Sequence, residues 1–246
     1  MAQKRKKTVR QASRVKFEHR LVLTNWLLNL FDAVSRRDIE LKLMEIKTII
    51  ENGELRNVEF NGLSSIMFGQ HLYQPLIHLN NDLVEVKPVP LNDGERDFVL
   101  DLQTFCTGNK DFFTGMELYL LRNMTRGRGI GFFEAGNFYP DFILWLIKDG
   151  RQFVSFIDPK GLRNLKGTDD PKIAFYKTIK TIEEDLRVQD DTITLNSFII
   201  SNTRMPEVAW WQGGMNKQEF EERHVLFQQE DKATYIKKML TKAQED

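Results

Sequence analysis

Two apolar segments that flank an Asp-Gly dipeptide place the strongest constraint on the fold of this 246-residue chain. Residues 138–147 and 152–158 are short and rich in aromatic and branched apolar side chains, which favours β-strands. Asp149-Gly150 lies between them, and this dipeptide is preferred in a two-residue type I′ turn. The sequence therefore predicts a β-hairpin over residues 138–161.

The turn also fixes which residues of the two strands lie opposite one another. With Asp149 and Gly150 as the loop, Lys148 pairs with Arg151, and continued pairing places Asp141 opposite Asp158. Directly opposed residues share a face, with Cβ atoms about 4.5–5.5 Å apart. Lys160 lies two residues beyond Asp158, so it is expected on that face as well.

Two opposed carboxylates repel, so a feature that offsets the repulsion is expected. A divalent cation such as Mg²⁺ does this, because it takes carboxylate oxygens and keeps several waters. Without metal, one carboxyl of the pair is expected to have a raised pKa. A bound cation can activate water and neutralise charge on a phosphate, and a lysine ammonium can hold either group. The three residues therefore indicate a phosphodiester hydrolase, with a solvent-exposed charged hairpin end as the alternative.

Pro140-Asp141 followed by Asp158-x-Lys160 resembles the signature of the PD-(D/E)xK nuclease superfamily. The wider stretch GERDF (94–98), YPDF (139–142) and IDPKG (157–161) is similar to the C-terminal cleavage domain of type III restriction enzymes and related defence helicases. The resemblance covers roughly residues 91–205. It implies a restriction-endonuclease-like fold and Mg²⁺-dependent cleavage of DNA, with Mn²⁺ able to substitute. Asp141 and Asp158 would be metal ligands, and Lys160 would assist the attacking water.

Two glutamates are candidates for completing the metal site. The superfamily often places a glutamate on the helix before the first strand, and Glu95 occupies that position. The alternative is that Asn92-x-x-Glu95 is a capping box, in which the glutamate accepts a backbone N–H. Glu134 is the second candidate. Pro159 departs from the family pattern and predicts that strand pairing ends there on one side, because proline has no N–H.

Four basic residues are candidate contacts for DNA phosphates. Arg126 and Arg128 lie in a glycine-rich loop, Arg122 precedes that loop, and Lys172 begins the helix after the site. A solvated turn and an ordinary amphipathic helix face are the alternatives.

The predicted elements also indicate the organisation of the chain. After residue 90 we expect a helix at 93–106, strands at 117–123, 138–147 and 152–158, a helix at 171–187, and strands at 195–201 and 223–228. This order predicts an α/β domain at 91–246 with a mixed central sheet flanked by helices. Pro88 and Pro90 mark its start. Residues 21–90 are expected to be mainly helical, with helices at 20–34 and from Ser35 to near Gly53.

Charge and cysteine content exclude several classes of protein. The chain has 35 basic and 35 acidic residues, so a uniformly basic nucleic-acid coat is excluded, although residues 1–20 form a basic arm. The single cysteine and the lack of a long apolar run predict a cytoplasmic protein with no membrane contact. No Walker motif is present, so a DNA-cleaving subunit is expected to work with a helicase/translocase or methyltransferase partner in phage defence. The alternatives are an inactive nuclease-fold module that binds nucleic acid or a partner subunit, and a repair or transposition nuclease.

Overall fold

The computed structural model divides the chain into two compact units. One comprises Met1–Met67 with Gln74–Leu91, and the other comprises Phe68–Tyr73 with Asn92–Asp246. The structure describes residues 14–16, 20–23, 33–54, 56–60, 63–69, 76–79, 84–87, 90–123, 130–132, 138–163, 165, 167, 169–208, 215–232 and 234–245. The rest of the basic arm lies outside these residues, as do Arg126, Arg128 and Glu134. Over the described part, no helix is long and apolar enough to cross a membrane.

The first unit combines one described helix with two three-stranded antiparallel sheets. Helix α2 runs from Ala33 to Glu51 and buries Leu43, Ile46 and Ile49. The strands of the first sheet are β1 (Arg14–Lys16), β2 (Arg20–Leu23) and β6 (Val84–Lys87). Those of the second sheet are β3 (Val58–Phe60), β4 (Leu63–Ile66) and β5 (Leu76–Leu79).

The expectation of a mainly helical segment at 21–90 is therefore wrong. Residues 20–23, expected in a helix, form β2, which pairs with β1 and with the distant β6. Such non-local pairing overrides the local periodicity that favoured a helix. The second expected helix is present as α2, but it begins at Ala33 rather than at Ser35. Gly53 follows its end with φ of 67°, a left-handed conformation that suits glycine.

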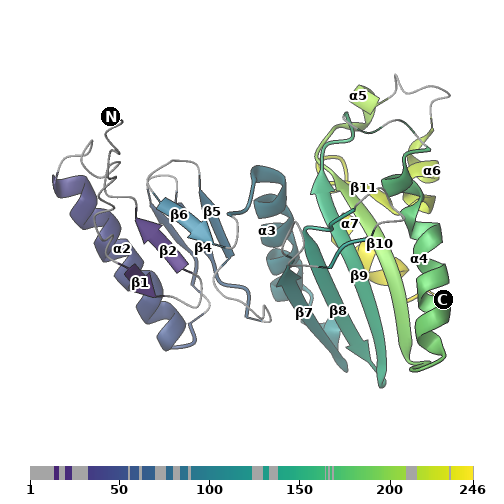
Figure 1. Cartoon of the computed structure of the whole chain (residues 1–246), viewed down its shortest axis with the longest axis horizontal. Helices are drawn as coiled ribbons and strands as arrows, with labels where there is room; N and C mark the ends of the chain where they lie inside the picture. Colours follow the sequence, from purple (N-terminus) through teal and green to yellow (C-terminus); the bar gives the residue numbers. More distant parts are fainter. Residues whose placement is uncertain are drawn as a thin grey trace, which may run out of the picture. The chain divides into compact units, whose positions relative to one another are not determined.

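The second unit is built around a five-stranded mixed sheet in the order β11-β10-β9-β8-β7 (Figure 1). Its strands are β7 (Met116–Arg122), β8 (Phe142–Lys148), β9 (Arg151–Lys160), β10 (Ile193–Ser201) and β11 (Val225–Phe227). Strands β7, β8 and β9 are antiparallel, whereas β10 runs parallel to β9 and β11 runs parallel to β10. The predicted α/β class and mixed sheet are confirmed.

Helices pack on both faces of this sheet. The described helices are α3 (Asp93–Gly108), η1 (Lys110–Phe113), α4 (Pro171–Arg187), α5 (Met205–Val208), α6 (Lys217–Glu222) and α7 (Tyr235–Lys242). Phe98 of α3 packs against Phe142 with ring centroids 5.4 Å apart. Phe175 of α4 packs in a cluster with Ile143. Phe142 and Ile143 are consecutive residues of β8 and therefore point to opposite faces of the sheet, so α3 and α4 cover different faces.

The β8–β9 hairpin has the predicted turn and register. Asp149 and Gly150 have φ of 50° and 77°, as a type I′ turn requires. Lys148 pairs with Arg151, and pairing continues outward to Phe142 and Ile157. The ladder with β8 ends there, before Pro159, whereas the ladder with β10 continues through Lys160. Ile157 pairs with Phe142, which faces α3. Asp158, the next residue, therefore points to the opposite face of the sheet, which α4 covers.

Candidate active site

The hairpin brings Asp141, Asp158 and Lys160 together. Asp141 directly precedes β8, while Asp158 and Lys160 belong to the end of β9. The two aspartate carboxyls lie close enough for the charge of Asp158 to raise the pKa of Asp141, and the Lys160 ammonium forms an ion pair with Oδ2 of Asp158. Asp158 is only 6% exposed, so this cluster is not a solvated hairpin end. The convergence predicted from the register is present in the structure.

The environment strongly raises the pKa of Asp141. Burial is the largest cause, and the neighbouring Asp158 carboxylate is the next. The Arg122 guanidinium opposes them, but the pKa of Asp141 still rises from 3.8 to about 8. A metal-free carboxylate pair was expected to behave in this way, because its two members resist ionising together.

This shift predicts that folding stability falls as the pH rises from about 4 to about 8 without metal. The Asp141 carboxyl keeps its proton up to about pH 8 in the folded protein but loses it near its ordinary value of 3.8 in the unfolded chain. The folded state therefore binds one more proton than the unfolded chain between these pH values. The free energy of unfolding should fall by at most about 1.4 kcal/mol per pH unit in this range. Urea unfolding in EDTA across this range measures the slope. Asp141→Asn should flatten it, and equal slopes in the two proteins would contradict the assignment.

Arg122 connects the aspartate pair to helix α3. Its Nη1 donates to the Asp141 backbone oxygen at 2.9 Å and lies 3.2 Å from Oδ1 of Asp141. Its Nη2 donates to Oε1 of Glu95 at 3.0 Å, and the guanidinium lies over the Phe142 ring. The Arg122 side chain is 8% exposed and is bound by carboxylates, so the expected phosphate contact is wrong for this residue. It positions Asp141 instead.

Glu95 has partners within the protein at both carboxylate oxygens. Its Oε2 accepts the Asn92 backbone N–H at 2.9 Å, and its backbone N–H donates to the Asn92 side chain. The capping-box alternative is therefore confirmed. Its Oε1 is bound by Arg122, and the residue is 3% exposed. Glu95 lies near the site, but in this arrangement it acts on Asp141 through Arg122.

Asn123 fixes the backbone around Asp141, a role that sequence reasoning missed. Its backbone N–H donates to the Asp141 oxygen at 2.8 Å. Its side-chain amide donates to the carbonyls of Ile130 and Pro140, each at 2.8 Å, and accepts from Ile130 N. This buried side chain joins the end of β7 to the segment that enters β8. No local pattern marks it, because its partners lie 7 and 17 residues along the chain.

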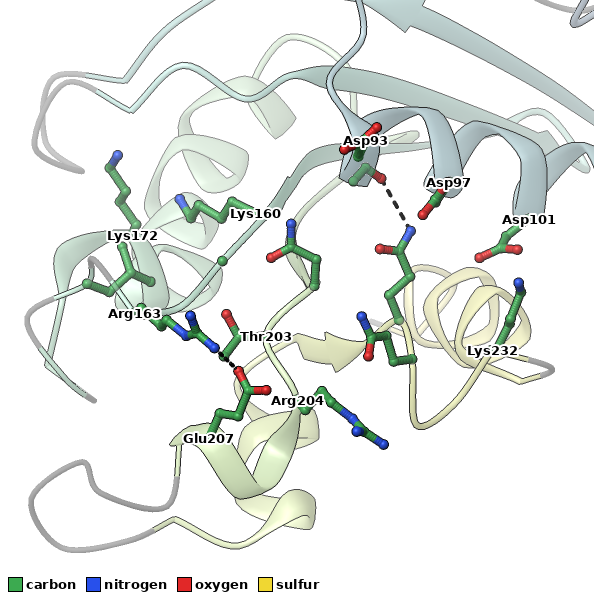
Figure 2. A pocket seen from close by; sticks show the side chains of 16 residues that line it. Asp93, Asp97, Asp101, Lys160, Arg163, Lys172, Thr203, Arg204, Glu207 and Lys232 are labelled. Atoms are coloured by element: carbon green, nitrogen blue, oxygen red, sulfur yellow. Dashed lines mark hydrogen bonds and ion pairs between the residues drawn. The ribbon is translucent and has the colours of Figure 1, made fainter. Parts of the chain in front are cut away.

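Lys160 links the aspartate pair to a cavity of about 860 Å³. Its ammonium lies 5.3 Å from the centre of the Phe138 ring. Lys172, an expected phosphate contact, lines the same cavity and stands on the same side of it as Lys160 in the view of Figure 2. It stands in the first turn of α4, which Asp170 caps by accepting the Lys172 backbone N–H at 2.9 Å. The structure thus places a second cation in the lining of the cavity that the candidate catalytic lysine also lines.

The donor set fits a hard divalent cation held by two carboxylates. Among the described residues, no group of three or more His, Cys, Asp or Glu side chains is placed to hold a metal ion. Mg²⁺ commonly binds through one or two carboxylates, with waters and substrate phosphates as its other ligands. Asp141 and Asp158 supply this number, and a cation held by both would neutralise the repulsion that helps to raise the pKa of Asp141.

Comparison of the chain with protein-family models, with curated proteins and with solved structures finds no match.

Proposed function

We propose that this chain is a metal-dependent endonuclease that hydrolyses DNA phosphodiester bonds with Mg²⁺ as cofactor. One observation carries the proposal: the end of a hairpin brings the buried Asp158 next to the half-buried Asp141, and Lys160 is ion-paired with Asp158. Burying ionisable groups in this way is costly unless they are paired or hold a cation. Perturbed carboxyl groups beside a cavity are typical of functional sites.

The architecture of the second unit supports a restriction-endonuclease-like fold. A mixed sheet with helices packed on both faces is what the sequence resemblance implies. The candidate site lies at one end of the β8–β9 hairpin, where Asp141 precedes β8 and Lys160 ends β9. Strand β9 supplies Asp158 and Lys160, and Asp141 directly precedes β8; a site built on such elements is held more precisely than a site on loops.

In the proposed mechanism, Asp141 and Asp158 would hold the cation as carboxylates, so Asp141 would have to be ionised in the metal-bound protein. Bound Mg²⁺ would lower the pKa of a coordinated water and neutralise charge on the phosphate. Arg122 holds the Asp141 carboxylate in place, and Glu95 holds Arg122. Lys160, beside Asp158 and open to the cavity, orients the attacking water or binds a phosphate oxygen.

DNA would reach the site along the cavity that Lys160 and Lys172 line. The formal net charge of zero supports an affinity for DNA that is local or supplied by a partner. By the resemblance, we propose that the partner is an ATP-driven helicase or a methyltransferase of a phage-defence system. A chain that binds DNA but never cuts it would instead be an inactive nuclease-fold module.

Plasmid cleavage tests the proposal. The full chain should nick or linearise supercoiled plasmid in Mg²⁺ or Mn²⁺ but not in EDTA. Lys160→Ala should reduce cleavage by about 100-fold or more, because it removes the cation beside the reacting groups. Lys148→Ala is the matched control, since Lys148 lies at the other end of the same hairpin and should be dispensable. Cleavage in EDTA, or equal loss in both variants, would contradict the proposed site.

A further inference from the structure

The cavity beside Lys160 is lined by side chains of both charges, among them Arg163, Arg204, Lys232 and Glu207. Figure 2 shows Lys160 and Lys172 together at one side and Asp93, Asp97 and Asp101 along α3 at the other. The three aspartates are spaced four residues apart, so they share one face of the helix. A volume of about 860 Å³ lies within the range of small-molecule sites and is large enough for a nucleotide.

Side-chain amides line the cavity between these two sides. Asn202 lies so close to Gly94 and Gly161 that a Cβ added to either glycine would stand 3.0 Å from its Nδ2 or 3.2 Å from its Oδ1. Gln228 is held by a hydrogen bond from its Nε2 to the Gly94 carbonyl at 3.3 Å. The two glycines therefore leave room for amide groups, which both donate and accept hydrogen bonds.

The charge pattern restricts what can fill this space. A phosphate fits at the lysine end. The α3 aspartates can accept hydrogen bonds from amino groups, although Arg96 is ion-paired with Asp93 and Asp97 and Lys232 interacts with Asp101. Arg96 binds Asp97 through Oδ1 only, with Nη2 at 2.7 Å and Nε at 2.9 Å. Among the described residues Oδ2 has no such partner. A carboxylate oxygen accepts from the amino group of cytosine, whereas thymine presents a carbonyl oxygen that it would repel.

We propose that this cavity binds one unpaired nucleotide of the substrate strand, with its phosphate at Lys160 and Lys172 and an amino-bearing base at Asp97. The inference rests on the proposed function, because it takes DNA as the substrate. It adds a preference for cytosine over thymine next to the cut, read by the α3 aspartates.

Calorimetric titration in EDTA tests this preference without any cleavage. The probes are the 5′-phosphorylated single strands dC4 and dT4. The full chain should bind dC4 about tenfold more tightly than dT4. Asp97→Asn should reduce the ratio to within about twofold, because an asparagine amide can donate to the thymine oxygen. Lys172→Ala should weaken the binding of both probes by the same factor. Asp185→Asn, on the exposed face of α4, should leave both affinities unchanged.

Equal affinity of the unmodified chain for the two probes, or an unchanged ratio in Asp97→Asn, would overturn the inference. The outcome is independent of catalysis. A protein that cuts plasmid but shows no preference would refute the nucleotide pocket alone. A protein that prefers dC4 but never cuts plasmid would refute the nuclease assignment and leave the pocket supported.

Discussion

Asp141→Asn should lower Mg²⁺-dependent plasmid cleavage by at least about 1000-fold, because it removes one of the two carboxylates proposed to hold the cation. A catalytic metal contributes several kcal/mol of transition-state stabilisation, which corresponds to a rate factor of this size. The fold should survive, since asparagine has the same shape and can still hydrogen-bond to Asp158. Initial rates of plasmid nicking, with the melting temperature measured in EDTA, check both parts.

The interaction between Asp141 and Asp158 predicts how the stability of the Asp141→Asn variant should depend on pH. Because burial and repulsion from Asp158 raise the pKa of Asp141 to about 8, the Asp141→Asn variant should match the unmodified protein in stability below about pH 4 and exceed it by a growing margin as the pH rises to about 8. Asp149→Asn, in the turn of the same hairpin, is the matched control and should cut normally. A variant at Asp141 that keeps more than about a tenth of the cleavage rate would contradict the assignment of Asp141 as a metal ligand.

Arg122→Met should destabilise the second unit by about 3–5 kcal/mol, the usual cost of removing one partner from a buried ion pair. The guanidinium is bound to Glu95 and Asp141, and its side chain is 8% exposed. Methionine fills much of the same space but leaves the Glu95 carboxylate buried without its cation. Urea unfolding at neutral pH measures the loss.

A double variant separates the charge effect from the packing effect. Glu95→Gln combined with Arg122→Met removes both charges, so it should be more stable than Arg122→Met alone. The Asn92 backbone N–H can still donate to the side-chain oxygen of a glutamine at position 95, which preserves the cap. If the double variant is no more stable than the single one, Arg122 acts through packing and not through its charge.

The hairpin could be predicted from sequence because all the information is local. Asp149-Gly150 selects the turn, the turn sets the register, and the register places Asp141 beside Asp158. A register error of one residue would have placed the two carboxylates on opposite faces. The direction of the pKa shift of Asp141 could be predicted from this pairing, whereas its largest cause, burial, depends on the packing around the hairpin.

The role of Arg122 could not be predicted in this way, because it depends on the pairing of β7 with β8. Arg122 pairs with Phe142, but residues 123–141 separate the two strands. A connection of that length does not fix a register, so the sequence did not show that Arg122 would contact Asp141 and Glu95. It was read instead with Arg126 and Arg128 as a phosphate contact.

The expected helix at 20–34 was wrong in its first residues for a related reason. The apolar residues after Arg20 repeat with helical spacing, yet 20–23 pair with Val84–Lys87 across more than sixty residues of chain. The spacing of apolar residues within a short segment carries no information about a strand partner more than sixty residues away. Helix α2, in contrast, has a continuous apolar face at Leu43, Ile46 and Ile49, and the pattern identified it.

A crystal of the full chain soaked in Mn²⁺ tests the central claim most directly, because manganese can be located by its anomalous scattering. The account predicts a peak bonded to one oxygen of Asp141 and one of Asp158. A crystal saturated with Mn²⁺ that shows no peak between these two carboxyls would contradict it.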